Sequence, residues 1–197
     1  MSKGDSTTSR ARPPRADAAR NRAALIEAAR ATFTTTGEDA SLEGIARSAG
    51  LGIGTLYRNF PTREDLVAAV YATELDAVIE AADEFRTTAP ADVSFRAWLD
   101  RYAEFVAAKR GMAETLRAGA LTTTAQTART RDRVNDAVGT FLRAGAQSGL
   151  LRDDVTADDV TTALVGVMLA VRDSDDDAQL SRLLDLLVDG LRPRAGS

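Results

Sequence analysis

Residues 41–66 read SLEGIARSAGLGIGTLYRNFPTREDL, and this stretch decides the fold. Ser41 precedes apolar residues at helical spacing, which predicts the N-cap of a short helix over residues 42–49. Gly50 can adopt the left-handed conformation that a tight turn needs. A second short helix is expected over residues 52–59. Two short helices joined by such a turn predict a helix-turn-helix, whose second helix has the right size for a DNA major groove.

Helical patterns continue on both sides of this motif. Phe60-Pro61 ends the second short helix because proline cannot continue it, and Thr62 predicts the N-cap of a long helix. Upstream, a helix from about Asp17 ends at Gly37. No stretch alternates as a strand would, so we expect an all-α fold of about nine helices. The expected helices cover residues 17–36, 42–49, 52–59, 63–87, 92–110, 112–119, 127–148, 157–173 and 177–191.

The composition excludes several function classes. The 197 residues include no cysteine and no histidine. Disulfides, thiol nucleophiles, imidazole bases and Cys- or His-ligated metals are therefore excluded. Phosphate-binding and nucleophile-elbow motifs are also missing. We therefore expect no enzyme, no cofactor and no metal site.

No segment indicates a membrane or an exported protein. The longest apolar run, residues 163–171, is far shorter than the ~18 residues that a span needs. The N-terminus is polar and basic, without the apolar core of a signal peptide. We therefore expect no membrane partner and a cytoplasmic location.

Charge is unevenly distributed along the chain. The net charge is −4, yet residues 1–64 hold 10 basic and 7 acidic residues, whereas residues 65–197 hold 15 basic and 22 acidic ones. Residues 1–16 have no apolar periodicity and predict a disordered basic arm. A basic end before an acidic body is expected where that end meets a polyanion. A merely solvated tail is the alternative.

Residues 45–66 also resemble the signature of the TetR/AcrR family of regulators, and the resemblance extends over about residues 18–72. It implies a homodimeric transcriptional regulator, usually a repressor released by a small ligand. It also implies a helix-turn-helix DNA-binding domain over residues 17–63 and a helical regulatory and dimerisation domain over residues 64–197. The matching elements are Ala49-Gly50, Gly54-Thr55-Leu56-Tyr57, Phe60-Pro61 and Arg63-Glu64-Asp65-Leu66.

The resemblance implies nine contacts to double-stranded, palindromic DNA. Helix N-termini suit phosphates, and glycines let the backbone approach DNA closely. Arg58 could read guanine, whereas Tyr57 and Arg63 would bind phosphate. The nine residues are Ser41, Gly52, Ile53, Gly54, Thr55, Tyr57, Arg58, Asn59 and Arg63.

Alternatives remain open at several of these positions. Tyr57 could cover the small core with its ring, Thr55 could be a local cap, and Arg58 could be a solvated surface residue. Glu43 is acidic where basic or polar residues are common in the family. It could repel phosphate, accept a hydrogen bond from a cytosine amine, or pair with Arg47.

The body carries two further candidate sets. Aromatic and Met residues predict the lining of a pocket for a small apolar effector, although each could belong to the core instead. These residues are Trp98, Tyr102, Phe105, Met112, Leu116, Phe141 and Met168. Two apolar helical stripes predict a four-helix interface between two copies of the chain, with packing inside one chain as the alternative. They contain Val160, Leu164, Val167, Val171, Leu180, Leu184, Leu187 and Leu191.

Two other functions remain possible on this reading. The body could bind a protein partner instead of a small molecule, in which case it would need no internal cavity. The chain could also be a dimerisation module with a vestigial helix-turn-helix. Tyr57, Arg63 and the basic arm argue against the second alternative.

Overall fold

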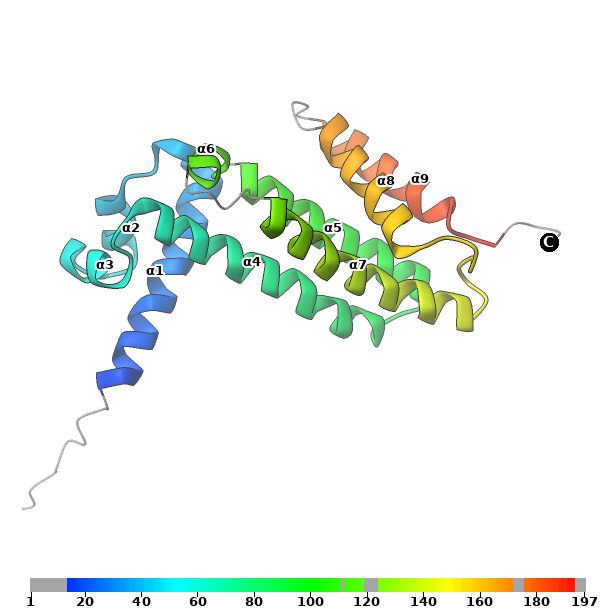
Figure 1. The fold of residues 1–197 in the computed structure, drawn as a ribbon, viewed down its shortest axis with the longest axis horizontal. Coiled ribbons are helices and arrows are strands. Elements are labelled where there is room, and N and C mark those ends of the chain that lie inside the picture. Colours follow the sequence, from blue (N-terminus) through cyan, green and yellow to red (C-terminus); the bar gives the residue numbers. More distant parts are fainter. Residues whose placement is uncertain (1–13, 111, 119–123, 172–175, 194–197) are drawn as a thin grey trace, which may run out of the picture.

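The computed structural model describes residues 14–110, 112–118, 124–171 and 176–193. Within these ranges the chain forms α-helices and one 3-10 helix without any strand, which confirms the all-α prediction (Figure 1). The elements are α1 (Pro14–Thr36), η1 (Gly37–Asp39), α2 (Leu42–Ser48), α3 (Ile53–Asn59), α4 (Arg63–Arg86), α5 (Ala91–Arg110), α6 (Ala113–Ala118), α7 (Thr124–Gln147), α8 (Ala157–Ala170) and α9 (Asp177–Asp189).

Local signals set the ends of the first helices. α1 begins at Pro14, three residues earlier than predicted, because a helix's first turn needs no N–H from proline. The rest of the predicted disordered arm, residues 1–13, lies outside the described residues. Gly37 ends α1 with a φ of 63°. Ser41 caps α2 as predicted, since its Oγ accepts a hydrogen bond from the Gly44 N–H at 3.0 Å.

The turn between α2 and α3 has the expected geometry. Gly50 lies at a φ of 69°, where a side chain would be strained. The N–H of Leu51 then donates to the Ala46 carbonyl at 2.9 Å. At the start of α4, Thr62 and Asp65 form a capping box, in which each side chain accepts from the other's backbone N–H.

Helix α4 connects the helix-turn-helix with the body of the molecule (Figure 1). It packs against α1 near its beginning and against α5 and α7 further along. Its buried apolar side chains therefore belong to one continuous core. In that core the Trp98 indole N–H donates to the Val78 carbonyl of α4 at 2.9 Å. The Trp98 ring lies 5.6 Å from the Phe141 ring of α7, centroid to centroid.

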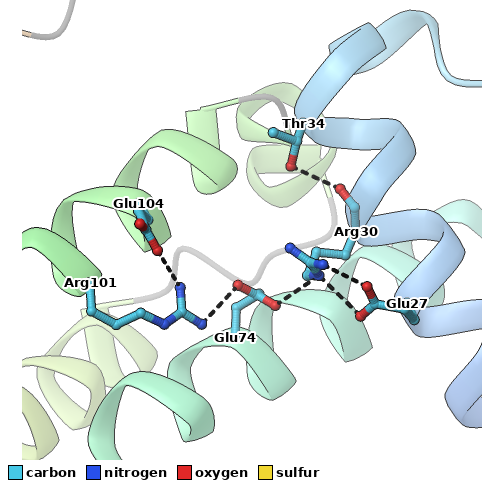
Figure 2. A network of polar contacts seen from close by, with 6 residues as sticks. All are labelled: Glu27, Arg30, Thr34, Glu74, Arg101 and Glu104. Atoms are coloured by element: carbon cyan, nitrogen blue, oxygen red, sulfur yellow. Dashed lines mark hydrogen bonds and ion pairs between the residues drawn. The ribbon is translucent and has the colours of Figure 1, made fainter. Parts of the chain in front are cut away.

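One buried carboxylate joins three helices (Figure 2). Glu74 of α4 is only 7% exposed. Its carboxylate oxygens lie 3.6 Å from the Arg30 guanidinium of α1 and 3.5 Å from the Arg101 guanidinium of α5. Each arginine also pairs with an acidic residue of its own helix, Glu27 for Arg30 and Glu104 for Arg101. A buried charge is tolerated only when it is paired in this way.

We expect Glu74→Gln to lower the free energy of unfolding by about 1–2 kcal/mol, because it removes the charge that holds two partly exposed arginines. Urea unfolding followed by circular dichroism at a fixed protein concentration measures this change. Glu104→Gln is the matched control: this exposed carboxylate also pairs with Arg101, and exposed pairs contribute at most about 1 kcal/mol. Equal effects of the two substitutions would contradict the role given to Glu74.

Candidate DNA-recognition surface and ligand cavity

The second helix of the motif, α3, presents a polar face to solvent. Leu56 is fully buried and fixes the inner face of α3 against α1 and α2. Gly52, Gly54 and Arg58 are exposed, and the Tyr57 side chain is 47% exposed. A ring that open does not serve as a cover for the small core. The exposed face of α3 is therefore available for an external partner.

Hydrogen bonds order the side chains of this face. The Arg58 guanidinium donates to the Gly54 carbonyl and to the Thr55 hydroxyl, both at 3.1 Å. The Asn59 amide donates to the Thr55 carbonyl at 2.8 Å. The Arg58 side chain thus lies along its own helix, next to Thr55, and the residue remains exposed to solvent. Ile53, Thr55 and Asn59 are half-buried at the margins of the same face.

The start of α2, which packs against α3, is also exposed to solvent. Because the Ser41 oxygen accepts from Gly44, its own O–H remains free to donate to a phosphate. Glu43 and Arg47 are both exposed, and no ion pair within 4 Å joins them in the described structure. Of the three alternatives for Glu43, pairing with Arg47 therefore has no support. Repulsion of phosphate and acceptance from a cytosine amine stay open.

The Arg63 side chain contacts other parts of the protein, and its implied phosphate contact stays a prediction. Its guanidinium donates to the Ala40 carbonyl at 2.5 Å and to the Thr115 hydroxyl of α6 at 3.4 Å. It also lies over the Phe33 ring of α1, 5.2 Å from the centroid. The side chain therefore connects the start of α4 with α1, α6 and the segment before α2. Sequence reasoning missed this role because its partners are far away in the chain.

A cavity of about 240 Å³ lies in the body, lined by residues of α4, α5, α6, α7 and α8. The hydroxyls of Tyr71 and Thr130 lie 3.2 Å apart in its wall. Burial raises the pKa of Tyr102 to about 12, so this residue stays a neutral phenol. The described lining residues are Tyr71, Tyr102, Lys109, Leu116, Thr127, Thr130, Arg131, Val134, Thr161 and Val165.

The cavity includes only part of the predicted pocket. Tyr102 and Leu116 line it, as predicted. The other predicted residues are nearly or fully buried and belong to the hydrophobic core, in line with the core alternative. They are Trp98, Phe105, Met112, Phe141 and Met168.

Sequence reasoning missed the polar part of the wall. The Lys, Arg and Thr residues of the wall come from three helices, α5, α7 and α8. They include Lys109, Thr130, Arg131 and Thr161. The available signal was weak, because Thr130 and Arg131 lie in a polar stretch, residues 127–133 (TARTRDR), that does not distinguish a cavity wall from a solvated helix face. Arg22 was also missed near α3; its guanidinium lies 4.7 Å from the centroid of the Phe60 ring, just after the C-terminus of that helix.

The two C-terminal helices pack mainly within the chain. Five of the eight predicted interface residues are at most 5% exposed in the single chain, whereas the other three, Val167, Leu180 and Leu187, are half-buried. The five are Val160, Leu164, Val171, Leu184 and Leu191. The large apolar side chains that face solvent are instead Leu169 of α8, 61% exposed, and Leu186 of α9, 66% exposed.

The described residues offer neither a metal centre nor a membrane span. Acidic side chains do not gather there into a group that could hold a metal ion. None of the helices in these ranges combines the length and the apolar character needed to cross a bilayer.

Two family models match this chain. Residues 25–70 match the model described as bacterial regulatory proteins of the tetR family. Residues 89–193, more than half of the chain, match the model described as the C-terminal domain of SbtR-like transcriptional regulators.

Curated and solved relatives agree with these models. An HTH-type transcriptional regulator of Staphylococcus aureus strain USA300 is 41% identical over 66 residues, which span 33% of this chain and 36% of the relative. The crystal structure of a TetR transcriptional regulator from Streptomyces coelicolor is similar with a TM-score of 0.78 and 40% identity, covering 88% of this chain and 99% of that one. A TetR regulator from Mycobacterium vanbaalenii has a TM-score of 0.72 and 28% identity, covering 92% and 100%.

The matched regions include the helix-turn-helix and all the cavity-lining residues except Tyr71. The fold and the exposed face of α3 are those expected of a DNA-binding regulator and not of an enzyme. The chain belongs to the TetR family of helix-turn-helix transcriptional regulators.

Proposed function

We propose that this protein is a ligand-responsive repressor that binds a palindromic operator as a homodimer and leaves it when a small molecule fills the cavity. The observation that carries this proposal is the dual role of α4. Its first residue, Arg63, contacts the segment before α2, and Tyr71, about two turns later, lines the cavity. A ligand that moves α4 would therefore also move the helix-turn-helix.

The exposed face of α3 supports the proposed DNA contacts. Arg58 and Thr55 lie together and are suited to base edges, with Ile53 and Asn59 beside them. Tyr57, Ser41 and the backbone at Gly52 and Gly54 are suited to phosphates. Arg63 belongs to this set only indirectly, because its guanidinium contacts Ala40 and Thr115.

The proposed dimer uses the outward faces of α8 and α9. Leu169 and Leu186 are exposed there, and Val167 and Leu187 of the predicted set are half-buried. Exposed apolar residues on two adjacent helices favour a helical interface between copies. A two-fold dimer presents two recognition helices about 34–36 Å apart, which requires a palindromic site.

The cavity favours a small effector over a protein partner. A body that binds only a protein needs no internal space, whereas this one contains about 240 Å³. As a DNA-binding protein, the regulator would act in the cytoplasm.

Selection of bound duplexes from a random DNA pool tests the proposal, and recovery of a palindrome is the expected result. Enrichment of no sequence would overturn it.

We expect Tyr57→Phe to weaken binding to all selected sites alike, by about tenfold, because a phosphate contact positions the protein without reading sequence. Arg58→Ala should instead relax the preference at one base pair of each half-site, with a loss of about 1–3 kcal/mol at the preferred base. Fluorescence anisotropy at one fixed salt concentration measures both effects.

The control for Arg58→Ala is Arg86→Ala, the same change at an exposed arginine at the far end of α4. It should leave operator affinity within about twofold, or about 0.4 kcal/mol. If Arg58→Ala lowered affinity for every sequence equally, Arg58 would be a phosphate contact and its assigned reading role would be wrong.

Leu169→Asp and Leu186→Asp should each shift the protein from dimer to monomer, because a charge in the centre of an apolar interface is costly. Sedimentation velocity measures the change, and operator affinity should fall with it. Val93→Asp on α5 changes a residue of similar exposure, 55%, and should leave the dimer intact. A dimer unaffected by all three substitutions would contradict this interface.

A further inference from the structure

The described wall of the cavity carries a positive charge without a balancing carboxylate. Lys109 of α5 is half-buried, with its ammonium 5.4 Å from the centroid of the Tyr71 ring. Among the described residues, no carboxylate lies within 4 Å of this ammonium, and the described lining includes neither Asp nor Glu. A cation beside a partly enclosed space, without a counter-ion among the described residues, attracts an anion more strongly than the same cation in bulk water.

A second observation in the same wall also indicates a ligand. Thr161 of α8 is 1% exposed, lines the cavity, and its hydroxyl has no hydrogen-bond partner within the described part of the chain. An unsatisfied buried hydroxyl costs about 1–3 kcal/mol, so an occupant with acceptor oxygens would relieve this cost. The Tyr71 and Thr130 hydroxyls bond to each other, and whichever accepts keeps its own O–H to donate.

The remaining polar groups limit the charge of the occupant. Arg131 already pairs with Asp158 of α8 at 2.7 Å and donates to the Thr162 hydroxyl at 2.6 Å. Its charge is therefore balanced within the protein. Tyr102 is a neutral phenol and does not repel an anion. Lys109 is thus the unbalanced charge of the described wall, which suits one negative charge better than two.

We propose that the cavity binds a small organic carboxylate with an apolar body. Lys109 attracts the carboxylate, the hydroxyls of Thr161 and of the Tyr71–Thr130 pair donate to it, and Leu116 and Val134 contact the apolar part. A volume of about 240 Å³ suits a small molecule, since pockets for drug-sized ligands measure ~300–1,000 Å³. This inference rests on the proposed function in one respect: it takes the bound carboxylate to be the effector. The proposed carboxylate replaces the purely apolar effector that was expected from the sequence.

Two matched sets of probes test the charge requirement. Phenylacetate, phenylacetamide and phenethylamine share one apolar body, and octanoate, octanamide and octylamine share another. Isothermal titration of the intact protein should show that at least one carboxylate binds ten or more times tighter than its amide, and that the amines do not bind. Equal affinity for a carboxylate and its amide, or no binding of either carboxylate, would overturn the proposal.

Variants assign the binding to this wall. Lys109→Gln should lower carboxylate affinity about tenfold, or about 1.4 kcal/mol, and remove the preference over the amide, whereas Lys109→Arg should retain it. Thr161→Val should also weaken carboxylate binding without loss of thermal stability, because it removes an unsatisfied hydroxyl. Arg133→Gln is the control: Arg133 lies on α7 outside the cavity lining, paired with Asp76, and its loss should change nothing. If Arg133→Gln lowered carboxylate affinity as much as Lys109→Gln, the effect would come from the overall charge of the protein, and the proposed site would be overturned.

A DNA experiment separates this inference from the proposed function. The bound carboxylate should release the selected operator from the wild-type protein but not from Lys109→Gln, which should bind operator normally when no probe is present. If the wild-type protein binds the carboxylate but selects no operator, the proposed repressor function fails and the carboxylate site stands. If the protein selects an operator but binds neither carboxylate, the carboxylate site fails and the proposed DNA-binding function stands.

Discussion

One buried carboxylate, that of Glu74, joins the helix-turn-helix to the body of the molecule. It lies on α4 between a guanidinium of α1 and another of α5, at 3.6 Å and 3.5 Å (Figure 2). α1 supports the helix-turn-helix, and α5 is a central helix of the body. A buried charge must keep its partners, so these contacts oppose any rotation of the helix-turn-helix against the body that would separate either arginine from Glu74.

Helix α4 connects the cavity of the body with the helix-turn-helix. From its start to its middle it presents Arg63 to the segment before α2, Tyr71 to the cavity and Glu74 to the two arginines. These groups lie within three turns of one rigid helix. The effector proposed to bind beside Tyr71 would therefore act on the same segment that positions α3, and the polar contacts of Arg63 and Glu74 would have to absorb a shift of that segment.

The helix-turn-helix could be predicted from sequence because its determinants are local. Ser41, Gly50 and Thr62 each act through a neighbour within a few residues, so the predicted helices nearly match α2, α3 and α4. The polar wall of the cavity could not be predicted, because Lys109 of α5 and Thr161 of α8 line the same cavity only through packing. The apolar stripes of α8 and α9 were visible, but periodicity does not tell whether a stripe faces its own chain or a second copy. Most of those residues face their own core.

The charge pattern gives each part of the molecule a different relation to anions. Residues 65–197 carry 22 acidic against 15 basic residues, so the outside of the body repels a DNA backbone and leaves binding to the basic N-terminal part. Inside that acidic body, the described cavity wall is positive. Because salt screens exposed charges beyond about 8 Å, the outer acidic surface does little to oppose an anion once it is near Lys109. The chain has no histidine, the side chain that ordinarily titrates between pH 5 and 8, and Tyr102 has a pKa of about 12. Under the proposed function, the signal for this cavity would therefore be the charge of a ligand and not a change of pH.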